Sequence, residues 1–366
     1  MADARASEEQ IARLRLIRSE NIGPVTYFQL LARFGSASAA LAAIPDLAAR
    51  GGGRAPKLAA RASVEREIER VDKLGARYLF LGQGLYPPLL AELESAPPAL
   101  IVKGHLTLLE RQCVAMVGAR NASAAACRFA RILAQTLGEG GAVIVSGLAR
   151  GIDTAAHDGA LDTGTVGVVA GGIDVIYPPE NEARQHAIAE RGLLVAEQPP
   201  GTEPRARHFP YRNRIIAGLA EGTVVVEAAP KSGSLITARF AADFGREVMA
   251  VPGSPLDPRA QGCNQLIREG ATLVQNADDV LEALSPLRPR PFRTRDDRYT
   301  PPQAVADAAE GDRRNVTALL NGTPVPVDEL IRQSALPPAV VQTVLLELEL
   351  AGRLERHAGG KVSLCG

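Results

Sequence analysis

Apolar residues follow three different patterns along the chain. Between residues 8 and 90 they recur at helical spacing, as in IARLRLIRS and SVEREIERVDKLGA, and this spacing predicts amphipathic helices. From about residue 100 to 285 they form short β-branched runs, each followed by a glycine-containing turn and a helical stretch. The seven runs span residues 113–118, 142–147, 165–172, 193–197, 223–228, 247–253 and 271–276.

Apolar runs without alternation are typical of parallel strands that are covered by helices on both faces. Their regular alternation with helical stretches indicates βαβ units. We therefore predict an α/β protein with a Rossmann-like, doubly wound and mostly parallel sheet. The helical segment before it and a smaller mixed segment after it are expected to be separate domains.

The changes in pattern divide the chain into four segments. A stretch rich in proline and arginine, SPLRPRPFRTRDDRYTPPQ, has no apolar period and is typical of a linker. In chain order we expect a helical domain of the SAM-like or helix-hairpin-helix type at 1–90, a Rossmann-like domain at 91–285, the linker at 286–311 and a winged-helix domain at 312–366.

The two terminal segments each raise a question about DNA. In NIGPVTYFQLLARFGS a small-residue turn precedes a helix that ends at Gly35, and the turn is either a phosphate site or an ordinary helix cap. In the last segment, helices at 312–321, 327–333 and 337–351 precede two short strands around Gly359 and Gly360. The third helix has no Lys or Arg and contains Glu347 and Glu349. Because helices that enter the major groove usually carry basic and amide groups, we favour a protein-interaction or regulatory role.

Composition narrows the function further. The 366 residues carry no formal net charge, so nucleic-acid binding would require a local basic patch. The charged N-terminus has no signal-peptide pattern and no apolar run approaches 18 residues, so we expect a cytoplasmic protein that does not enter a membrane. The four cysteines form no CxxC and are expected to be reduced.

Candidate binding residues gather where the predicted strands end. In open α/β sheets, ligands bind beyond the carboxyl ends of the strands, near the point where the strand order reverses. Glycines, hydroxyls and cations at these ends, together with helix N-termini, suit an anion with several phosphates. This set comprises Gly118, Arg120, Ser146, Gly147, Arg150, Arg205, Arg207, Lys231, Ser232, Gly233 and Ser234, the last as the expected cap of the next helix.

Motifs for catalysis, cofactors and metals are missing from the sequence. It contains no GxGxxG, GxxxxGK[ST], HExxH or GxSxG, and we predict no cofactor, no metal site and no catalytic residue. Asp153 and His157, four residues apart, are expected to pair on a helix. Glu227, at the end of a strand, is either a base or, as we favour, a carboxylate that caps or pairs with nearby groups.

Rings and cations gather in one stretch, HFPYRNRIIAGLA, at 208–220. Phe209 and Tyr211 flank a proline in an expected loop that also holds Arg205, Arg207, Arg212, Asn213 and Arg214. A ring on which bases stack, next to cations that hold phosphates, is typical of a single-strand binder. The alternative is that the phenyl ring anchors the loop in the core while the arginines pair with Glu197 and Glu203.

Six motifs appear in order through residues 113–284, and together they closely resemble the DNA-processing protein A family, also called DprA or Smf. They are GARNAS, SGLARGIDTAAH, IYPPEN, FPYRNRIIAGL, KSGSLITARFAADFGREVMAVPG and GCNQLIREGA. The resemblance implies a bacterial cytoplasmic protein of natural transformation that binds and protects incoming single-stranded DNA. It also implies help in loading the RecA recombinase, a homodimer formed through the Rossmann-like domain, and no catalysis.

The resemblance also suggests roles for single residues. It makes Arg120 a phosphate contact, within Gly118-Ala119-Arg120, where alanine replaces the family's serine. It makes Phe209 the ring that stacks on a base and Lys231 a further phosphate contact. For the cation expected shortly before the phenylalanine, Arg205 and Arg207 are both candidates.

Two other classes of protein compete with this interpretation. An enzyme of the phosphoribohydrolase type would resemble lysine-decarboxylase-like proteins and carry PGGxGTxxE. The matching segment here, APKSGSLITARF, lacks the glutamate, which argues against that class. The third possibility is a structural scaffold in which the set of binding residues is vestigial.

Overall fold

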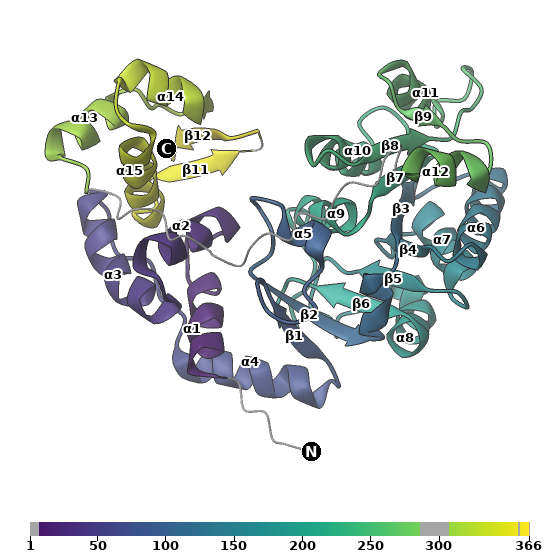
Figure 1. Ribbon diagram of the computed structural model, residues 1–366, viewed down its shortest axis with the longest axis horizontal. Coiled ribbons are helices and arrows are strands. Elements are labelled where there is room, and N and C mark those ends of the chain that lie inside the picture. The colour runs from purple at the N-terminus through teal and green to yellow at the C-terminus, as the bar shows by residue number, and fades with distance from the viewer. Residues whose placement is uncertain (1–6, 286–306, 358, 366) are drawn as a thin grey trace. The chain divides into compact units, whose positions relative to one another are not determined.

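The computed structural model describes residues 7–285, 307–357 and 359–365. These residues form two compact units (Figure 1). The sheet unit contains residues 67–285, and the terminal unit combines residues 7–66 with the described residues from 307 onward. The helix α4 (Arg61–Lys73) runs across the boundary between them.

A nine-stranded sheet forms the centre of the sheet unit, in the order β1-β2-β6-β5-β4-β3-β7-β8-β9. The strands from β6 to β9 in this order are parallel, and β2 and β1 extend the β6 edge in antiparallel pairing. Each of the seven predicted runs contains a strand, so the doubly wound sheet is confirmed. The strands are β1 (Arg77–Phe80), β2 (Ala99–Gly104), β3 (Cys113–Gly118), β4 (Val143–Ser146), β5 (Thr165–Val168), β6 (Leu193–Ala196), β7 (Gly222–Val226), β8 (Glu247–Ala250) and β9 (Thr272–Leu273).

The two antiparallel strands were not predicted. β1 lies within the stretch that we expected to be helical throughout, and that expectation is wrong at this point. β1 contains four residues, RYLF, and a run this short does not distinguish a strand from a helical turn by spacing. Its partner β2, whose residues pair with those of β1 one by one, is what makes it a strand.

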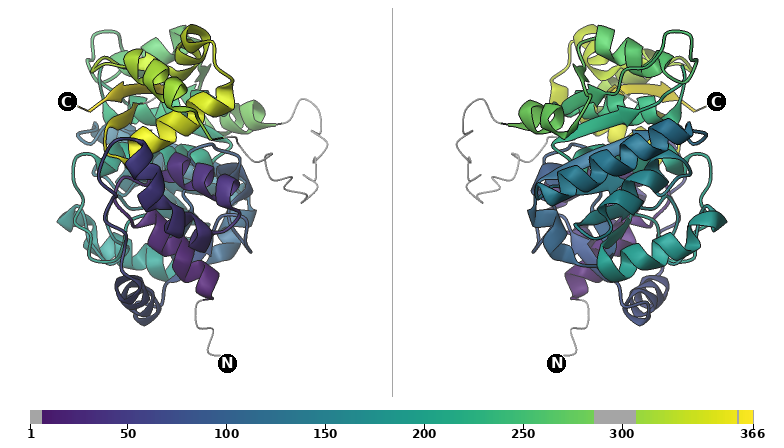
Figure 2. Two further views of the ribbon diagram at one scale, coloured as in Figure 1. Left: turned by 90° about the vertical axis from the view of Figure 1, so that its left-hand side faces the viewer. Right: turned by 90° about the vertical axis from the view of Figure 1, so that its right-hand side faces the viewer.

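Helices cover both faces of the sheet, and the right-hand view of Figure 2 looks onto one of the two layers. Alternate strand residues point to opposite faces, so that Val114 and Met116 of β3 pack with one helical layer and Ala115 and Val117 with the other. One layer contains α6 (Ala124–Glu139), α7 (Ile152–Ala160), α8 (Glu182–Arg191) and α12 (Ala277–Leu284), and the other contains α5 (Pro88–Ala91), α9 (His208–Leu219), α10 (Gly233–Asp243) and α11 (Gln261–Arg268).

The strand order reverses between β3 and β7. From β3 the chain moves outward through β4, β5 and β6, and then returns to place β7 on the other side of β3. The connections after these two strands leave in opposite directions, which opens a crevice at their carboxyl ends. The end of β3 is Gly118 and that of β7 is Val226.

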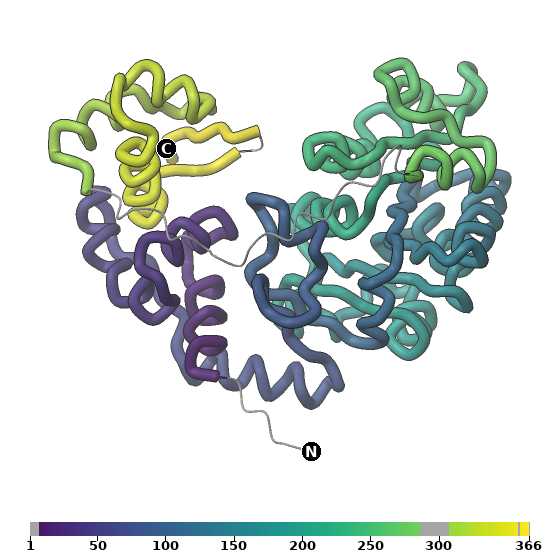
Figure 3. The backbone as a smooth tube through the Cα atoms, in the orientation of Figure 1, coloured from purple at the N-terminus to yellow at the C-terminus, as the bar shows by residue number. Residues whose placement is uncertain are grey.

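The terminal unit brings the two ends of the chain together, as the purple and yellow parts of the tube in Figure 3 show. Its N-terminal part is helical, and Gly35 ends α2 in the left-handed conformation at φ 74°. Its C-terminal part is a winged helix with sheet order β10-β12-β11. The elements are α1 (Glu8–Ile17), α2 (Pro24–Phe34), α3 (Ala37–Arg50), α13 (Glu310–Ala318), β10 (Val325–Pro326), α14 (Val327–Ser334), α15 (Pro338–Leu350), β11 (Leu354–His357) and β12 (Lys361–Leu364).

Within the described ranges, no single helix has both the length and the apolar composition to span a membrane, although α2 and α3 together, bent by 104°, reach both.

Candidate functional site

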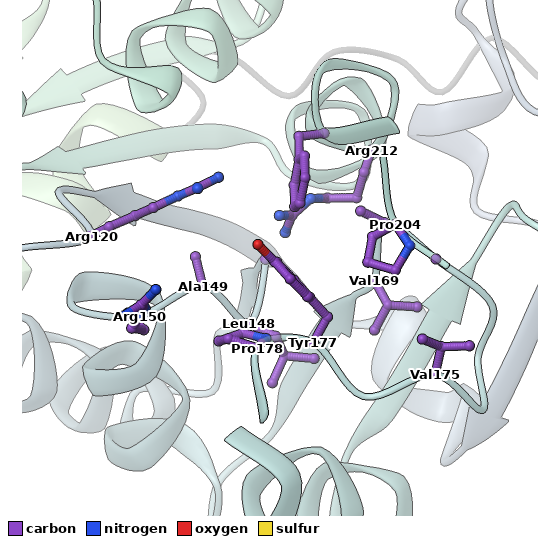
Figure 4. Close-up of a pocket in the computed structure, with 14 residues that line it drawn as sticks. Arg120, Leu148, Ala149, Arg150, Val169, Val175, Tyr177, Pro178, Pro204 and Arg212 are labelled. Atoms are coloured by element: carbon purple, nitrogen blue, oxygen red, sulfur yellow. The ribbon is translucent and has the colours of Figure 1, made fainter. Parts of the chain in front are cut away.

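An open cleft lies where the strand order reverses, lined by the turn after β3, the loops after β4 and β5, and α9. Its enclosed volume is small, about 30 Å³. In Figure 4 the side chains of Arg120, Tyr177 and Arg212 point toward the same space. A ligand at this place would therefore lie across the surface and would not be enclosed.

A cation and two rings meet in the cleft. The guanidinium carbon of Arg120 lies 5.2 Å from the ring centroid of Phe209, within the range of a cation–π contact. The ring of Tyr177 lies 5.6 Å from the same ring at an interplanar angle of 52°. Arg120 is exposed, Phe209 is half-buried and Tyr177 is 45% exposed, so that all three are accessible to a ligand.

The turn that carries Arg120 is held by close backbone packing. A Cβ atom at Gly118 would lie 1.9 Å from the carbonyl oxygen of Val226, so only glycine lets β3 and β7 approach this closely at their ends. Gly151, with φ 75°, begins α7, and a Cβ there would lie 2.2 Å from the carbonyl oxygen of Ala119. The backbone position of Arg120 thus depends on Gly118 and Gly151, which allow the neighbouring backbone to pack closely against its turn.

Glu227 also stabilises this turn. Its carboxylate accepts hydrogen bonds from the amide of Ser123 at 2.8 Å and from the hydroxyl of Ser123 at 2.6 Å. The same hydroxyl oxygen accepts a bond from the amide of Ala126 and caps α6. Of the two interpretations of Glu227, base or capping group, the contacts are those of a capping group.

The expected pair of Asp153 and His157 does not form. Asp153 accepts hydrogen bonds from the amides of Gly147 at 3.1 Å and Ala149 at 3.2 Å, and a ring nitrogen of His157 lies 2.7 Å from the hydroxyl of Thr165. Burial raises the pKa of Asp153 and lowers the pKa of His157 to about 3. Asp153 thus holds the loop after β4, and His157 contacts the first residue of β5.

Arg212 lines the inner wall of the cleft. It is only 6% exposed, and it donates a hydrogen bond to the carbonyl oxygen of Val168 at 3.1 Å. Burial lowers the pKa of its guanidinium to about 10, while the facing carboxylate of Asp153 acts in the opposite direction. A Cβ at Gly147 would lie 1.5 Å from a nitrogen of this guanidinium. Gly147 therefore makes room for a buried cation that stays charged at neutral pH.

Three of the predicted binding residues turn away from the surface. Arg214 is buried and pairs with Glu197 at 2.5 Å, as the alternative interpretation of the arginines expected. Ser146 is fully buried, and its hydroxyl donates to the carbonyl oxygen of Met116 at 2.6 Å. Ser234 is buried as well. The structure therefore removes these three side chains from the surface available to DNA.

Two local predictions need correction. The cap of α10 is Ser232, and not Ser234, because the Ser232 hydroxyl accepts the hydrogen bond at the helix start. The stretch from His208 onward is helix α9, and not a loop. Since residues two apart on a helix do not share a face, Tyr211 does not join Phe209 in one platform. The ring that joins it is Tyr177.

The remaining predicted cations lie at the surface. Arg205, Arg207 and Lys231 are exposed, and within the ranges that the structure describes they form no ion pair. Arg150 lines the cleft and pairs with Glu180 at 3.6 Å; both are exposed, and such pairs contribute little stability.

The KSGS turn is tied to α9. The side-chain amide of Asn213 donates to the carbonyl oxygen of Gly233 at 3.3 Å. Lys231 adopts the left-handed conformation at φ 67°, just before the capping residue Ser232. Three candidates of the KSGS turn, Lys231, Ser232 and Gly233, therefore remain near the start of α10.

Tyr177 is the main site residue that we did not predict. It lies in the IYPPEN stretch, one of the six motifs behind the resemblance, and forms a cis peptide bond with Pro178. That motif was an available signal. It follows no strand end directly, and the rule about strand ends therefore did not select it.

The fold and the cleft together define a class: a Rossmann-like protein with a helical N-terminal domain, a winged-helix C-terminal domain and a basic, ring-lined cleft where the strand order reverses. The family model described as DNA recombination-mediator protein A matches residues 77–285. The models of the DprA-like N-terminal HHH domain and the DprA winged helix domain match residues 7–69 and 300–360. The chain belongs to the DNA-processing protein A (DprA/Smf) family.

Individual relatives agree with this assignment. The chain is 48% identical to the DNA processing protein DprA of Streptococcus pneumoniae over 198 residues, which cover 54% of this chain and 70% of the relative. It is 37% identical to the protein Smf of Escherichia coli over 308 residues, 83% of this chain and 82% of the relative.

Two solved structures are similar as well. The X-ray structure of S. pneumoniae DprA superposes with a TM-score of 0.63 at 37% identity and covers 76% of this chain and 98% of its own. The DNA processing protein A of Helicobacter pylori, described for its single-stranded DNA binding mode, superposes with a TM-score of 0.52 at 30% identity. It covers 57% of this chain and 95% of its own.

Proposed function

We propose that the cleft at the carboxyl ends of β3, β4 and β5 binds single-stranded DNA. The observation that carries this proposal is the contact between Arg120 and Phe209, two accessible side chains brought within 5.2 Å from segments far apart in the sequence. In this proposal the phenyl ring stacks on a base and the guanidinium holds a neighbouring phosphate. The related protein from H. pylori, described as a single-stranded DNA binder, supports it.

The other polar residues in this proposal fall into three groups: exposed cations, donors at a helix start, and a buried cation. Arg150, Arg205, Arg207 and Lys231 are exposed and extend the positive surface on which a phosphate backbone lies. Helix starts supply further donors: Ser232 and Gly233 begin α10. Arg212, behind the rings, contributes positive charge from below without reaching the DNA.

Arg120→Ala and Phe209→Ala test the proposal in fluorescence anisotropy with labelled single-stranded and duplex oligonucleotides across a salt series. Removing the ring is expected to cost about 1–3 kcal/mol, or roughly 5- to 150-fold in Kd, for single strands. Removing the cation is expected to weaken binding and to reduce the slope of log K against log salt by about 0.7.

Arg268→Ala is the matched control. Arg268 is an exposed arginine at the end of α11, and helices between parallel strands end at the edge of the sheet opposite the carboxyl ends. It should leave the affinity within about twofold of the parent, since changes at exposed sites away from a ligand are small. Equal affinity for duplex and single strands, or indifference to both cleft variants, would contradict the proposal.

The finer functions follow the family resemblance and are part of the same proposal. We propose that the chain protects incoming single-stranded DNA in natural transformation, helps to load RecA onto it, acts in the cytoplasm and forms a homodimer through the Rossmann-like domain. A strand-exchange assay with RecA and a single-strand-binding protein tests the loading step. Its prediction is faster joint-molecule formation with the parent chain than with Phe209→Ala.

We also propose that the cleft performs no catalysis. The carboxylates at the strand ends, Asp153 and Glu227, are occupied in holding backbone amides, which supports this view. Incubation with nucleoside monophosphates tests it, and release of free base would favour the phosphoribohydrolase class instead.

A further inference from the structure

The third helix of the winged helix, α15, is buried on nearly all sides. One side, with Val341, Val344 and Leu348, packs in the core of the winged helix itself. The other side packs against the N-terminal helices, where Leu346 and Leu350 belong to the same apolar cluster as the residues of α2 and α3. Figure 1 shows α15 beside these helices within the terminal unit. Beyond its exposed first turn, a helix that lies between two cores has little free surface for another macromolecule.

Polar contacts follow the same interface. The side-chain amide of Gln29 donates to that of Gln342 at 3.0 Å, and Arg33 donates to the hydroxyl of Thr343 at 3.3 Å. These contacts join α2 to α15. Just before α13, Asp307 forms ion pairs with Arg33 and, at 2.8 Å, with Arg50. The N-terminal helices therefore hold the winged helix both at α15 and at the start of the domain.

Three consecutive glycines after α3 allow the closest approach. A Cβ at Gly51 would lie 2.1 Å from the carbonyl oxygen of Glu347, and a Cβ at Gly53 would lie 2.3 Å from that of Ala351. Gly51 has φ −70°, which every residue adopts, so that its lack of a side chain serves contact with α15 and not its own conformation. The glycine run is thus a docking surface for the end of α15.

The chemistry of α15 fits protein contact and not DNA. Its sequence PAVVQTVLLELEL contains no basic residue, and the buried Glu347 is neutralised by Arg313 of the same domain at 2.8 Å. In helix-turn-helix domains the corresponding helix enters the major groove. Here that helix is covered from Val341 onward. The turn that precedes α2 lies close to the end of α15, since a Cβ at Gly352 would lie 3.2 Å from the side-chain amide of Asn21.

We propose that α15 is a docking helix whose partner is the N-terminal helical domain of the same chain, and that the winged helix does not use it to bind duplex DNA. Because the partners are joined covalently, docking occurs at a high effective concentration. The glycine run at 51–53, which the cleft does not use, is the receiving surface of this contact.

Cross-linking of the full-length chain tests the docking. Cysteines replace Gln29 and Gln342 in a chain whose Cys127 and Cys365 are changed to serine, and a short bis-maleimide is added. The parent is expected to give a cross-link within one chain. Gly51→Ala should slow it at least tenfold, because the new methyl group meets backbone at 2.1 Å. Gly311→Ala, whose Cβ has no neighbour within 4 Å, should not change it.

Several outcomes would overturn the proposal. These are the absence of a cross-link in the parent, a cross-linked dimer (which would mean docking between two chains), or an unchanged rate in Gly51→Ala. If Gly51→Ala does not fold, as judged by circular dichroism, Gly53→Ala provides the same test against the carbonyl of Ala351.

Duplex binding tests the second half of the proposal. With a labelled duplex, the affinity of Gly51→Ala should stay within twofold of the parent. A gain of tenfold or more would show that docking hides a helix able to bind DNA, and the assignment of α15 as a dedicated docking helix would be wrong.

Discussion

At the scale of single residues, the stretch 208–214 shows that the type of a side chain does not determine whether it reaches the surface. Its two arginines were both expected to bind phosphate, but α9 places Arg212 beneath the cleft and directs Arg214 to Glu197. The cation that meets the ring of Phe209 is Arg120, from a strand end about ninety residues earlier. Residue type thus predicted a basic, aromatic site, whereas burial decided which members of it are accessible.

The two tyrosines near the site give a prediction at this scale. Tyr177→Ala should weaken single-strand binding, because its ring lies against Phe209 and bases stack on such platforms, at about 1–3 kcal/mol per base. Tyr211→Ala removes a ring that is more exposed, at 56%, from another side of α9 and should change Kd by less than about threefold. Anisotropy at constant salt compares the two, and a larger loss for Tyr211→Ala would contradict the geometry of the cleft.

At the scale of elements, apolar runs without alternation predicted every parallel strand, because such runs are typical of strands with both faces covered. The antiparallel strands β1 and β2 were missed. The four residues of β1 do not distinguish a strand from a helical turn by spacing, and the stretch ALIVKG of β2 was not among the seven predicted runs. The rule about strand ends selected the correct edge of the sheet. It did not select Tyr177, which lies in a longer connection after β5.

Glu227 connects two elements, β7 and the start of α6, and its role is testable. Glu227→Ala should lower the free energy of unfolding by about 1–2 kcal/mol, because it leaves the amide of Ser123 without its carboxylate. Glu227→Gln keeps an acceptor oxygen and should cost less. Urea unfolding followed by circular dichroism measures both, and stability equal to the parent in Glu227→Ala would contradict the capping role.

At the scale of the whole molecule, the two ends of the chain form one unit while the middle forms another. From sequence, the N-terminal helices and the winged helix were separate domains. Their association depends on the glycines at 51–53, on Leu346 and Leu350, and on Asp307. No local pattern in the sequence indicates that these residues contact one another. The apolar face of α3 and that of α15 could equally be buried within a separate core in each domain.

Acid should weaken this association. Partial burial acts to raise the pKa of Asp307, but hydrogen bonds and charge from Arg50 and Arg33 hold it below its ordinary value of 3.8. Arg313 of α13 also faces this carboxylate, and all three arginines stay charged in acid. A carboxylate with a lowered pKa contributes stability above its ordinary pKa, and that contribution is lost as the pH falls through the lowered value.

The measurement compares the parent with Asp307→Asn. The parent should have the higher urea midpoint between about pH 5 and pH 7, and the difference should shrink below about pH 4 as Asp307 is protonated. A difference that stayed constant down to about pH 2, or that was absent near pH 7, would contradict a charged contact between Asp307 and the N-terminal helices.

By itself the sequence determined the fold class, the order of the parallel strands along the chain, the winged helix and the chemical character of the site. These follow from local periodicity and residue type, which act over a few residues at a time. Only the tertiary structure decided that Arg120, Phe209 and Tyr177 meet, that Ser146, Arg214 and Ser234 do not take part, and that α15 docks on α3. The reason is physical: accessibility and contact depend on which distant segments pack together, and a buried arginine and an exposed one have the same letter in the chain.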